Sequence, residues 1–376
     1  MRILVITWNY PPKTGGMEMM MQQLVSHLRT QAEVHVFGPY AEVETVEEAT
    51  TRPQHDGLAW FFLAAGLSCF RLLHRESFDV IIAGSTLVMP VVYVLGLLFG
   101  LPVAVNVYGL DLIYSHPLYQ LMLKVLLKRF DRVFAISQAS KAEALKRGAS
   151  PDDVVIAHPG LDFSEFERQP DQARLKQRHG LAGHRVLLSV GRLAKRKGIP
   201  EFVTYALPDI VAAYSDVVFL VVGDNPTQSL THKEDVKARI EAAVESQNLE
   251  AHVRLLGRVD RNVLVDLYQA CDVFVLPAIH VPGDMEGFGI VLTEAGAAGK
   301  PVVSTKLGGI TDAVVDGKSG ILVEAERWDE LSDAVLALLA DESLRQEMGQ
   351  FGRQRVRTEL DWSIVAGRYL EHLKDL

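Results

Sequence analysis

Short apolar runs alternate with amphipathic stretches along the first half of the chain. The runs RILVIT, EVHVFGP, DVIIAG, PVAVNVYG, RVFAIS and VVIAHPG predict strands, and MEMMMQQLVSHLRT, LYQLMLKVLLKRF and KAEALKRG between them have helical spacing. Strands that alternate with helices form parallel sheets with helices on both faces. The first half therefore predicts a doubly wound α/β domain.

This alternation lapses once and then restarts. Residues 162–184 are rich in charge, include Pro170 and carry no strand signal. Strands are predicted again at RVLLSVGRL, VVFLVVGD, VRLLGRV, DVFVLPA, PVVSTK and GILVE, and the end of the sequence, DWSIVAGRYLEHLKDL, has the pattern of one amphipathic helix. The predicted organisation is a first domain at 1–165, a linker with a helix in it at 166–184, a second domain at 185–359 and a helix at 360–376 that returns to the first domain.

Two such domains suggest where a ligand binds. In open α/β sheets, ligands bind outside the carboxyl ends of the strands. Two parallel sheets that face each other would form a cleft between the domains, and the chemistry is expected there.

One uncharged stretch, Val80–Leu110, raises the alternative of a membrane span, which needs about 20 apolar residues. Glycines and prolines interrupt this stretch at Gly84, Pro90 and Pro102, among other positions. They divide it into a strand, a helix and a second strand, and buried parallel strands are continuously apolar. A buried strand–helix–strand unit is therefore favoured over a membrane span.

Composition narrows the class of protein. Hydrophobic residues make up 48% of the 376 residues, which supports a packed core. A net charge of −9 argues against a nucleic-acid partner, which would need a broad basic surface. Two cysteines, Cys69 and Cys271, form neither a disulfide framework nor a zinc motif. A cytoplasmic location is expected.

The segment DMEGFGIVLTEAGAAGKPVV carries two glutamates, Glu286 and Glu294, with seven residues between them. It follows a predicted strand, and GIVLTEAGAAG has the pattern of a helix, so Glu286 lies just outside the helix N-terminus. The N–H groups at Phe288 to Ile290 would have no intrahelical partner and would favour an anion, which Gly287 and Gly289 would let approach closely.

A carboxylate beside an anion site needs an explanation. Glu286 is suited to accept hydrogen bonds from hydroxyl groups attached to that anion, and Glu294 would reach another hydroxyl-bearing part of the same ligand. The alternative is that both are ordinary surface carboxylates, with Glu286 as a charge at the helix start.

A second candidate is VGRLAKRKG, residues 190–198, where Arg192 and Lys197 follow a predicted strand. Two cations at the carboxyl end of a strand suit a diphosphate and the negative charge that develops on a leaving group. The alternative is a solvated basic loop, because Lys195 and Arg196 lie in the same run.

Together these motifs resemble the retaining glycosyltransferases of family four. The resemblance rests on E-G-F-G-I-V-x-x-E-A, on the following G-K-P-V-V and on the Gly-Gly of KLGGITDAVVDGKSGILV, with G-R-L-x-x-x-K-G in support. It implies the two-Rossmann GT-B fold. It also implies that Glu286 contacts the transferred sugar, that Glu294 holds the ribose, and that Arg192, Lys197 and the backbone from Gly287 to Ile290 bind the donor diphosphate.

Weaker matches extend the resemblance over nearly the whole chain. The glycine loop PPKTGGME places Gly16 toward the donor phosphate, and LLGRV places Arg258 and Val259 beside the base. In NVYGLD, Tyr108 stands where the family often has histidine, and Asp111 follows, so both are candidates on the acceptor side. Tyrosine hydrogen-bonds a sugar but does not titrate near neutral pH.

The function implied is transfer of a hexose from a GDP- or UDP-sugar to a hydroxyl of a glycan or lipid-linked acceptor. Mannose is the expected sugar, because HVPGDMEGFGIVLTEA is similar to mannosyltransferase members of the family. No Asp-x-Asp occurs, so neither a metal nor another cofactor is expected. A non-hydrolysing sugar-nucleotide epimerase and a non-catalytic nucleotide-sugar binder are the alternatives.

The segment LYQLMLKVLLKRFDR, residues 118–132, suggests a further partner. As a helix it would place Lys124, Lys128 and Arg132 in one row beside a Leu/Val face. That pattern is typical of a helix that lies on an anionic membrane surface, and also of a core-facing helix with a solvated side. If the helix lies on a membrane surface, a weak peripheral contact with the cytoplasmic face of a membrane is expected.

Overall fold

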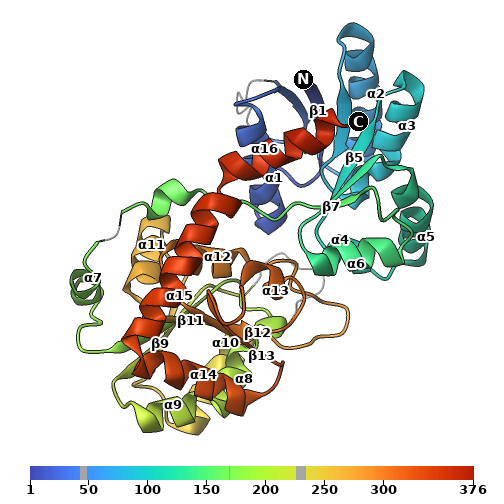
Figure 1. Cartoon of the computed structure of the whole chain (residues 1–376). Coiled ribbons are helices and arrows are strands. Elements are labelled where there is room, and N and C mark those ends of the chain that lie inside the picture. Colours follow the sequence, from blue (N-terminus) through green and yellow to red (C-terminus); the bar gives the residue numbers. More distant parts are fainter. Residues whose placement is uncertain (43–48, 169, 226–233) are drawn as a thin grey trace. The chain divides into compact units, whose positions relative to one another are not determined.

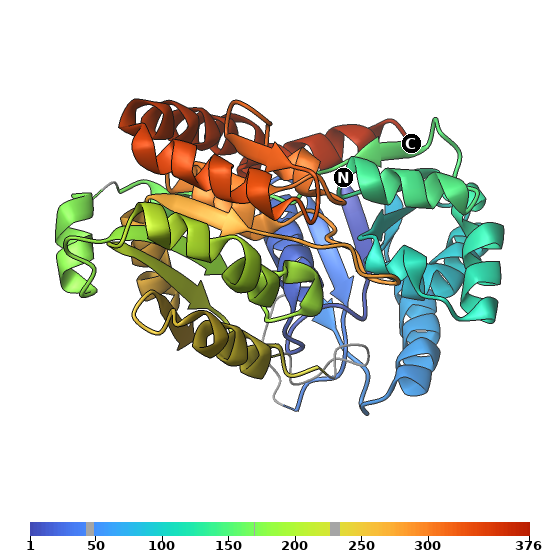
Figure 2. The same cartoon turned by 90° about the horizontal axis from the view of Figure 1, so that it is seen from below.

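The computed structural model describes residues 1–42, 49–168, 170–225 and 234–376. The chain divides into two compact units, the first made of residues 1–160 and 360–376, and the second of residues 161–359. Each unit is built on one parallel sheet with helices on both faces (Figures 1 and 2). The expectation of two Rossmann-like domains is confirmed.

The first unit contains a seven-stranded parallel sheet in the order β3-β2-β1-β4-β5-β6-β7. Its strands are β1 (Arg2–Ile6), β2 (Glu33–Phe37), β3 (Thr50–Thr51), β4 (Val80–Ala83), β5 (Val103–Val107), β6 (Arg132–Ala135) and β7 (Val154–Ile156). Its helices are α1 (Gly16–Leu28), α2 (Leu58–Arg75), α3 (Met89–Phe99), α4 (Leu110–Ile113), α5 (Pro117–Leu126), α6 (Gln138–Lys146) and α16 (Trp362–Lys374), with short 3₁₀ turns η1 (Thr86–Val88) and η2 (Leu127–Arg129).

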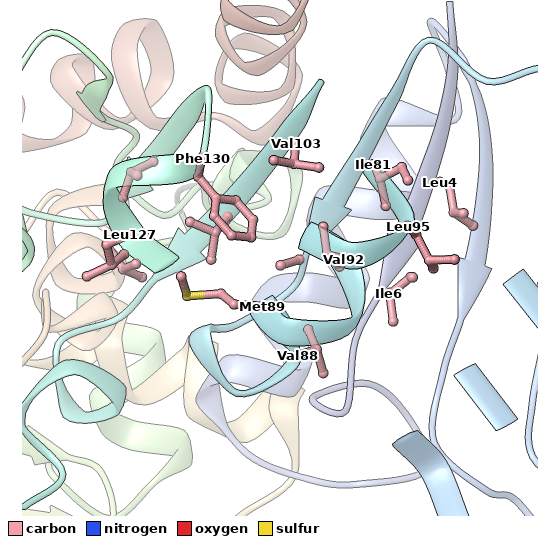
Figure 3. Close-up of a cluster of buried hydrophobic side chains, with 14 of the residues drawn as sticks. Leu4, Ile6, Ile81, Val88, Met89, Val92, Leu95, Val103, Leu127 and Phe130 are labelled. Atoms are coloured by element: carbon pink, nitrogen blue, oxygen red, sulfur yellow. The ribbon is translucent and has the colours of Figure 1, made fainter. Parts of the chain in front are cut away.

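Side chains alternate across this sheet because successive residues of a strand point to opposite faces. Leu4 and Ile6 of β1 join the core under α2, α3 and α5. On the same face, Met89 and Val92 of α3 are buried in the close-up of Figure 3. Apolar residues on the inner side of α3 therefore fix that helix against the sheet.

The uncharged stretch forms β4, α3 and β5, as the sequence predicts. Pro90 lies in the first turn of α3, where its missing N–H has no helical partner to lose. Within the described residues, no helix combines the length and the apolar character that a membrane crossing requires.

The C-terminal helix α16 packs on the first unit, on the opposite face of the sheet from α3. The Tyr369 hydroxyl donates to Asn106 Oδ1 at 2.8 Å, and its ring stacks on Phe134 with 4.2 Å between centroids. At the start of α16, Trp362 stacks on His27 of α1. The predicted return of the last helix to the first domain is thus observed.

The second unit contains a six-stranded parallel sheet in the order β10-β9-β8-β11-β12-β13. Its strands are β8 (Arg185–Val190), β9 (Val217–Val222), β10 (Val253–Gly257), β11 (Val273–Leu276), β12 (Val302–Thr305) and β13 (Gly320–Val323). Its helices are α7 (Gln172–Arg178), α8 (Ile199–Tyr205), α9 (Leu207–Ala213), α10 (Val236–Gln247), α11 (Arg261–Ala270), α12 (Ile290–Ala297), α13 (Ile310–Ala313), α14 (Trp328–Ala340) and α15 (Glu342–Arg355), with turns η3 (Phe163–Phe166), η4 (Lys195–Lys197) and η5 (Val356–Leu360).

Both sheets reverse their strand order next to the first strand of the unit. In the second unit this reversal lies between β8 and β11, which pair in parallel. The connections that leave the carboxyl ends of two such strands run to opposite faces of the sheet and leave a crevice between them. The segments after β8 and β11 are therefore the expected location of a ligand.

One local expectation needs correction. The helix expected over 118–132 ends at Leu126 and is followed by the turn η2, while Arg132 is the first residue of β6. Arg132 is therefore not in line with Lys124 and Lys128. The region 166–184, expected as a linker that holds a helix, contains α7, whose Lys176 pairs with Asp272 at 2.7 Å inside the second unit.

Candidate active site

The loops that follow β8 and β11 meet at the strand reversal of the second unit. The N–H of Ile279 donates to the carbonyl of Arg196 at 2.9 Å, which ties the two loops together. A Cβ at Gly198 would lie 1.9 Å from the carbonyl oxygen of Pro277, and φ at this residue is 64°. Only glycine allows this approach without strain, so Gly198 permits the loop carrying Lys197 to press against the β11 loop.

Four charged side chains form a buried cluster where these loops meet. Lys197 Nζ lies 2.7 Å from Glu286 Oε2, and Arg196 Nε donates to the same oxygen at 3.3 Å. Arg196 also donates through Nη1 to Asp284 Oδ2 at 3.3 Å. The four side chains are only 7–11% exposed. Buried charges are tolerated when they are paired and hydrogen-bonded, and here two cations balance two carboxylates.

The cluster determines the ionisation of Glu286. Burial alone would raise the pKa of this carboxyl, but attraction to Lys197 and Arg196 outweighs burial and holds the pKa at about 2. Burial lowers the pKa of Lys197, and Glu286 opposes that change. Glu286 is thus a permanent anion near neutral pH, so it accepts hydrogen bonds and does not act as a general acid.

The helix after the cluster begins with donors that no side chain caps. Helix α12 starts at Ile290 after Gly289, and no side chain accepts a hydrogen bond at this N-terminus. The first N–H groups of a helix lack intrahelical acceptors and favour an anion. The N–H of Gly309 donates to the Glu286 carbonyl at 2.9 Å, and a Cβ there would lie 2.0 Å from the Gly287 carbonyl oxygen. The Gly-Gly turn of KLGGI therefore packs directly on the E-G-F-G backbone.

The second glutamate of the motif is held by two partners on α11. Arg261 Nη1 donates to Glu294 Oε1 at 2.5 Å, and the hydroxyl of Tyr268 donates to Oε2 at 2.7 Å. Arg261 Nε also donates to Glu165 at 3.0 Å. The Glu294 side chain is 9% exposed, so its carboxylate is fixed in position before any ligand binds.

The side chains of both glutamates are buried, so the interpretation that they are surface carboxylates is wrong. The basic run is divided: Arg196 and Lys197 are buried, whereas Arg192 and Lys195 are exposed. The interpretation of a wholly solvated loop is therefore wrong for Lys197. The Arg192 guanidinium is close enough for its charge to contribute to the lowered pKa of Lys197.

The remaining candidates of the second unit also follow strand ends. Arg258 comes directly after β10 and is exposed, and Val259 beside it is half-buried. Arg192, Lys197, Glu286 and Arg258 thus come from the segments after β8, β11 and β10. The structure brings them to one edge of one sheet, while their contacts with a donor stay predictions.

Three candidates lie in the first unit. Gly16 is the exposed first residue of α1. Tyr108 is buried, its hydroxyl donates to the carbonyl of Gly84 at 3.0 Å, and burial raises its pKa well above the usual value. Asp111 accepts from the backbone N–H groups of Tyr108 and Gly109 at 2.9 and 3.0 Å, and burial raises its pKa. Both therefore make internal contacts, which leaves their acceptor-side roles as predictions.

Arg196, Arg261 and Tyr268 hold the two glutamates and Asp284 holds Arg196, and sequence reasoning missed all four. Arg196 looked like one more solvated charge in the run K-R-K, and Asp284 was not singled out in the loop before Glu286. In the sequence, Arg196 lies 88 positions from Asp284 and 90 from Glu286. Glu294 lies 33 positions from Arg261 and 26 from Tyr268. Only the packed loops bring these partners together.

Comparison with known proteins identifies similar glycosyltransferases. The model of the glycosyl transferases group 1 matches residues 171–355, and that of glycosyltransferase family 4 matches residues 14–165. The GDP-mannose-dependent alpha-(1-6)-phosphatidylinositol monomannoside mannosyltransferase of Mycobacterium tuberculosis is 25% identical, with 99% of this chain and 98% of that protein covered. The alpha-maltose-1-phosphate synthase of Mycolicibacterium smegmatis is also 25% identical over the same shares.

Solved structures show the same fold. Anabaena HepE in complex with UDP superimposes with a TM-score of 0.82 at 22% identity, and both chains are covered completely. The sucrose-phosphate synthase of Thermosynechococcus elongatus gives a TM-score of 0.79 at 23% identity, with 100% of this chain and 98% of that chain covered.

Proposed function

The chain belongs to glycosyltransferase family 4 and is a hexosyltransferase that uses nucleotide sugars, and we propose that it transfers its sugar with net retention of configuration. The observation that carries the proposal is the buried cluster of Glu286, Lys197 and Arg196 beside the uncapped start of α12. In this cluster, the permanently ionised carboxylate of Glu286 is suited to accept hydrogen bonds from sugar hydroxyls. The neighbouring positive charge and the backbone N–H groups are suited to bind a diphosphate.

The proposed reaction follows from these roles. The bond between the anomeric carbon and the β-phosphate breaks, and Lys197, Arg192 and the N–H groups at the start of α12 stabilise the charge on the departing diphosphate. The acceptor hydroxyl bonds to the anomeric carbon on the same face of the sugar. Its proton passes to the departing phosphate, so no protein base is required. Glu286 holds hydroxyl groups of the sugar during this change.

The donor is proposed to be GDP-mannose, so the sugar transferred is proposed to be mannose. The segment around Glu286 is similar to mannosyltransferases, and the relative from Mycobacterium tuberculosis is GDP-mannose-dependent. UDP-sugars are the second candidate, because HepE was solved with UDP and with UDP-glucose. Transferase models and relatives favour this reaction over an epimerase.

The acceptor is proposed to be a glycan or a lipid-linked hydroxyl. The relative from Mycobacterium tuberculosis acts on a phosphatidylinositol mannoside, which supports a lipid-linked acceptor. Peripheral contact with the cytoplasmic face of a membrane is part of this proposal.

Donor binding is expected to stabilise the protein without any divalent metal. Arg192, Lys197 and the N–H groups at the start of α12 supply the positive charge that a metal would otherwise supply to a diphosphate. A ligand at about 100 times its Kd adds about 2.7 kcal/mol to the free energy of unfolding. Thermal unfolding should be measured in EDTA with GDP-mannose, other GDP-sugars and UDP-sugars, and repeated with magnesium.

The expected result is a higher Tm with GDP-mannose, equal in EDTA and in magnesium. A rise that appears only with magnesium or manganese would contradict metal independence. No rise with any nucleotide sugar would contradict the proposed donor class.

A further inference from the structure

Three helices of the first unit expose large apolar side chains on their outer sides. Helices α2 and α3 pack side by side, and α5 packs next to α3 (Figure 1). The exposed side chains are Leu58, Trp60, Leu63, Leu67 and Phe70 of α2, Val94, Leu97 and Leu98 of α3, and Leu118, Leu121 and Val125 of α5. We refer to these eleven side chains as the apolar face.

The middle of the apolar face is hollow. A groove of about 500 Å³ lies between α2 and α3, with Leu67 and Phe70 on one wall and Val94 and Leu98 on the other. A Cβ at Gly66 would touch nothing within 4 Å, so this position adds no side chain to fill the groove. Every residue that lines the groove is apolar or glycine.

These helices are apolar on their inner sides as well. Phe61 and Cys69 of α2, and Val92 and Leu95 of α3, are buried against the sheet. A helix that is hydrophobic all round is normally covered on all sides. The outer sides of α2 and α3 therefore match an apolar environment rather than water.

The helical segments that carry the apolar face contain charge of one sign only. The segments Leu58–Arg75, Met89–Phe99 and Pro117–Arg129 contain no Asp or Glu, although the whole chain has a net charge of −9. They carry Arg71, Arg75, Lys124, Lys128 and Arg129, all exposed.

These cations border the apolar helices. Arg129 reaches α3, where its Nη1 donates to the hydroxyl of Tyr93 at 2.8 Å. The acid that follows α2, Glu76, is paired with Arg2 at 2.5 Å. An apolar patch with a cationic border is complementary to a surface of acyl chains below anionic phosphates.

We propose that the apolar face docks on an anionic lipid bilayer, with its leucines and Phe70 among the acyl chains and the five cations against lipid phosphates. This docking surface gives a location to the membrane contact that the proposed function includes. The docking proposal rests on the proposed function only for the lipid-linked acceptor. The α2–α3 groove, rather than α5 alone, is the principal apolar contact. A second copy of this chain is a poorer occupant, because it would bring ten cations to one interface while the same segments contain no Asp or Glu to pair with them.

Sedimentation of the full chain with phosphatidylcholine vesicles, with and without phosphatidylglycerol, tests this proposal. Binding is expected only to vesicles that contain phosphatidylglycerol, and it should weaken as salt is added. Leu67→Asn combined with Val94→Asn and Leu98→Asn should reduce binding by more than about tenfold, since binding scales with buried apolar area. Lys124→Glu with Lys128→Glu should also reduce binding by more than about tenfold.

Matched controls lie on the second unit. Tyr205→Asn changes an exposed large apolar residue of α8, and Arg174→Glu with Lys237→Glu changes the net charge by the same amount as the paired lysine reversal. Both controls should bind vesicles like the wild type. The Tm shift with nucleotide is measured on every variant, so that loss of folding or of donor binding is seen separately from loss of vesicle binding.

Three results would overturn the proposal. The first is absence of binding to anionic vesicles at low salt. The second is wild-type binding by both the apolar and the charge variants. The third is self-association of the wild type that the apolar variant abolishes, without vesicle binding, which would assign the apolar face to a second copy. A normal Tm shift with nucleotide alongside any of these would leave the transferase assignment intact.

Discussion

Replacing Glu286 with glutamine is expected to lower kcat while nucleotide affinity stays nearly unchanged. The carboxylate is proposed to hold hydroxyls of the transferred sugar, and these bonds strengthen as the sugar flattens toward an oxocarbenium-like transition state. Losing a charged hydrogen-bond acceptor costs about 1.5–3 kcal/mol, so kcat should fall by about tenfold to a hundredfold. Steady-state kinetics and the Kd of free nucleotide measure the two effects separately.

The low pKa of Glu286 predicts how the activity and stability of the wild type depend on pH, and how Glu286→Gln differs. With its pKa near 2, the carboxyl stays ionised as the pH falls from neutral, so it contributes no limb to the wild-type pH–rate profile near neutrality. Because the folded pKa is below the unfolded value of 4.5, the ionised carboxylate stabilises the protein above about pH 4.5. That stability is lost as the pH falls toward 2 and should be absent in Glu286→Gln.

Glu286→Gln also removes negative charge that offsets the buried positive charges of Lys197 and Arg196, so it lowers stability as well as activity. Asp284→Asn is the matched control, because Asp284 balances Arg196 in the same cluster but is not proposed to touch the sugar. This control should lose stability and keep kcat. If Glu286→Gln keeps its kcat, or if Asp284→Asn loses as much, Glu286 does not have the proposed role.

Replacing Glu294 with alanine is expected to raise the donor KM and weaken nucleoside-diphosphate binding, with a small change in kcat. The ribose does not change during the reaction, so its contacts stabilise the ground state and the transition state equally. One charged hydrogen-bonding partner is worth about 1.5–3 kcal/mol, which corresponds to about a tenfold to a hundredfold weaker Kd. Calorimetry with free nucleotide measures this directly.

Tyr268→Phe is the control for this variant. It removes the hydrogen bond to Glu294 Oε2 and keeps the ring that stacks on Phe274. Arg261 still holds the other oxygen, so nucleotide affinity should change less than in Glu294→Ala. Normal nucleotide binding by Glu294→Ala would show that this carboxylate only stabilises α11 and α12.

Much of the fold follows from the pattern of apolar runs. Every strand inferred from such a run is present, because continuous apolar segments between breakers match parallel strands, of which the central ones are buried on both faces. The two-residue strand β3 was not anticipated, since Thr50–Thr51 forms no apolar run. Helix α2 was not anticipated either, because its apolar residues surround the helix and show no clear face.

The site could be predicted only in part. The spacing of Glu286 and Glu294 around glycines was visible in the sequence, as were Arg192 and Lys197 after a strand. The burial of Arg196 and its bonds to Asp284 and Glu286 were not visible, because they depend on how the loops after β8 and β11 meet. Side-chain partners across loops are set by tertiary packing, which local patterns do not encode.

The most direct test of the proposed diphosphate site at the buried cluster is a calorimetric titration of the full chain in EDTA with GDP, GMP, UDP and UMP. If the cluster and the start of α12 hold a diphosphate, at least one nucleoside diphosphate binds about tenfold or more tightly than its own monophosphate. Lys197→Met should remove most of that difference. Equal affinities for the diphosphate and monophosphate of each base, or no binding by any of the four, would contradict the assignment of this site to a nucleotide-sugar donor.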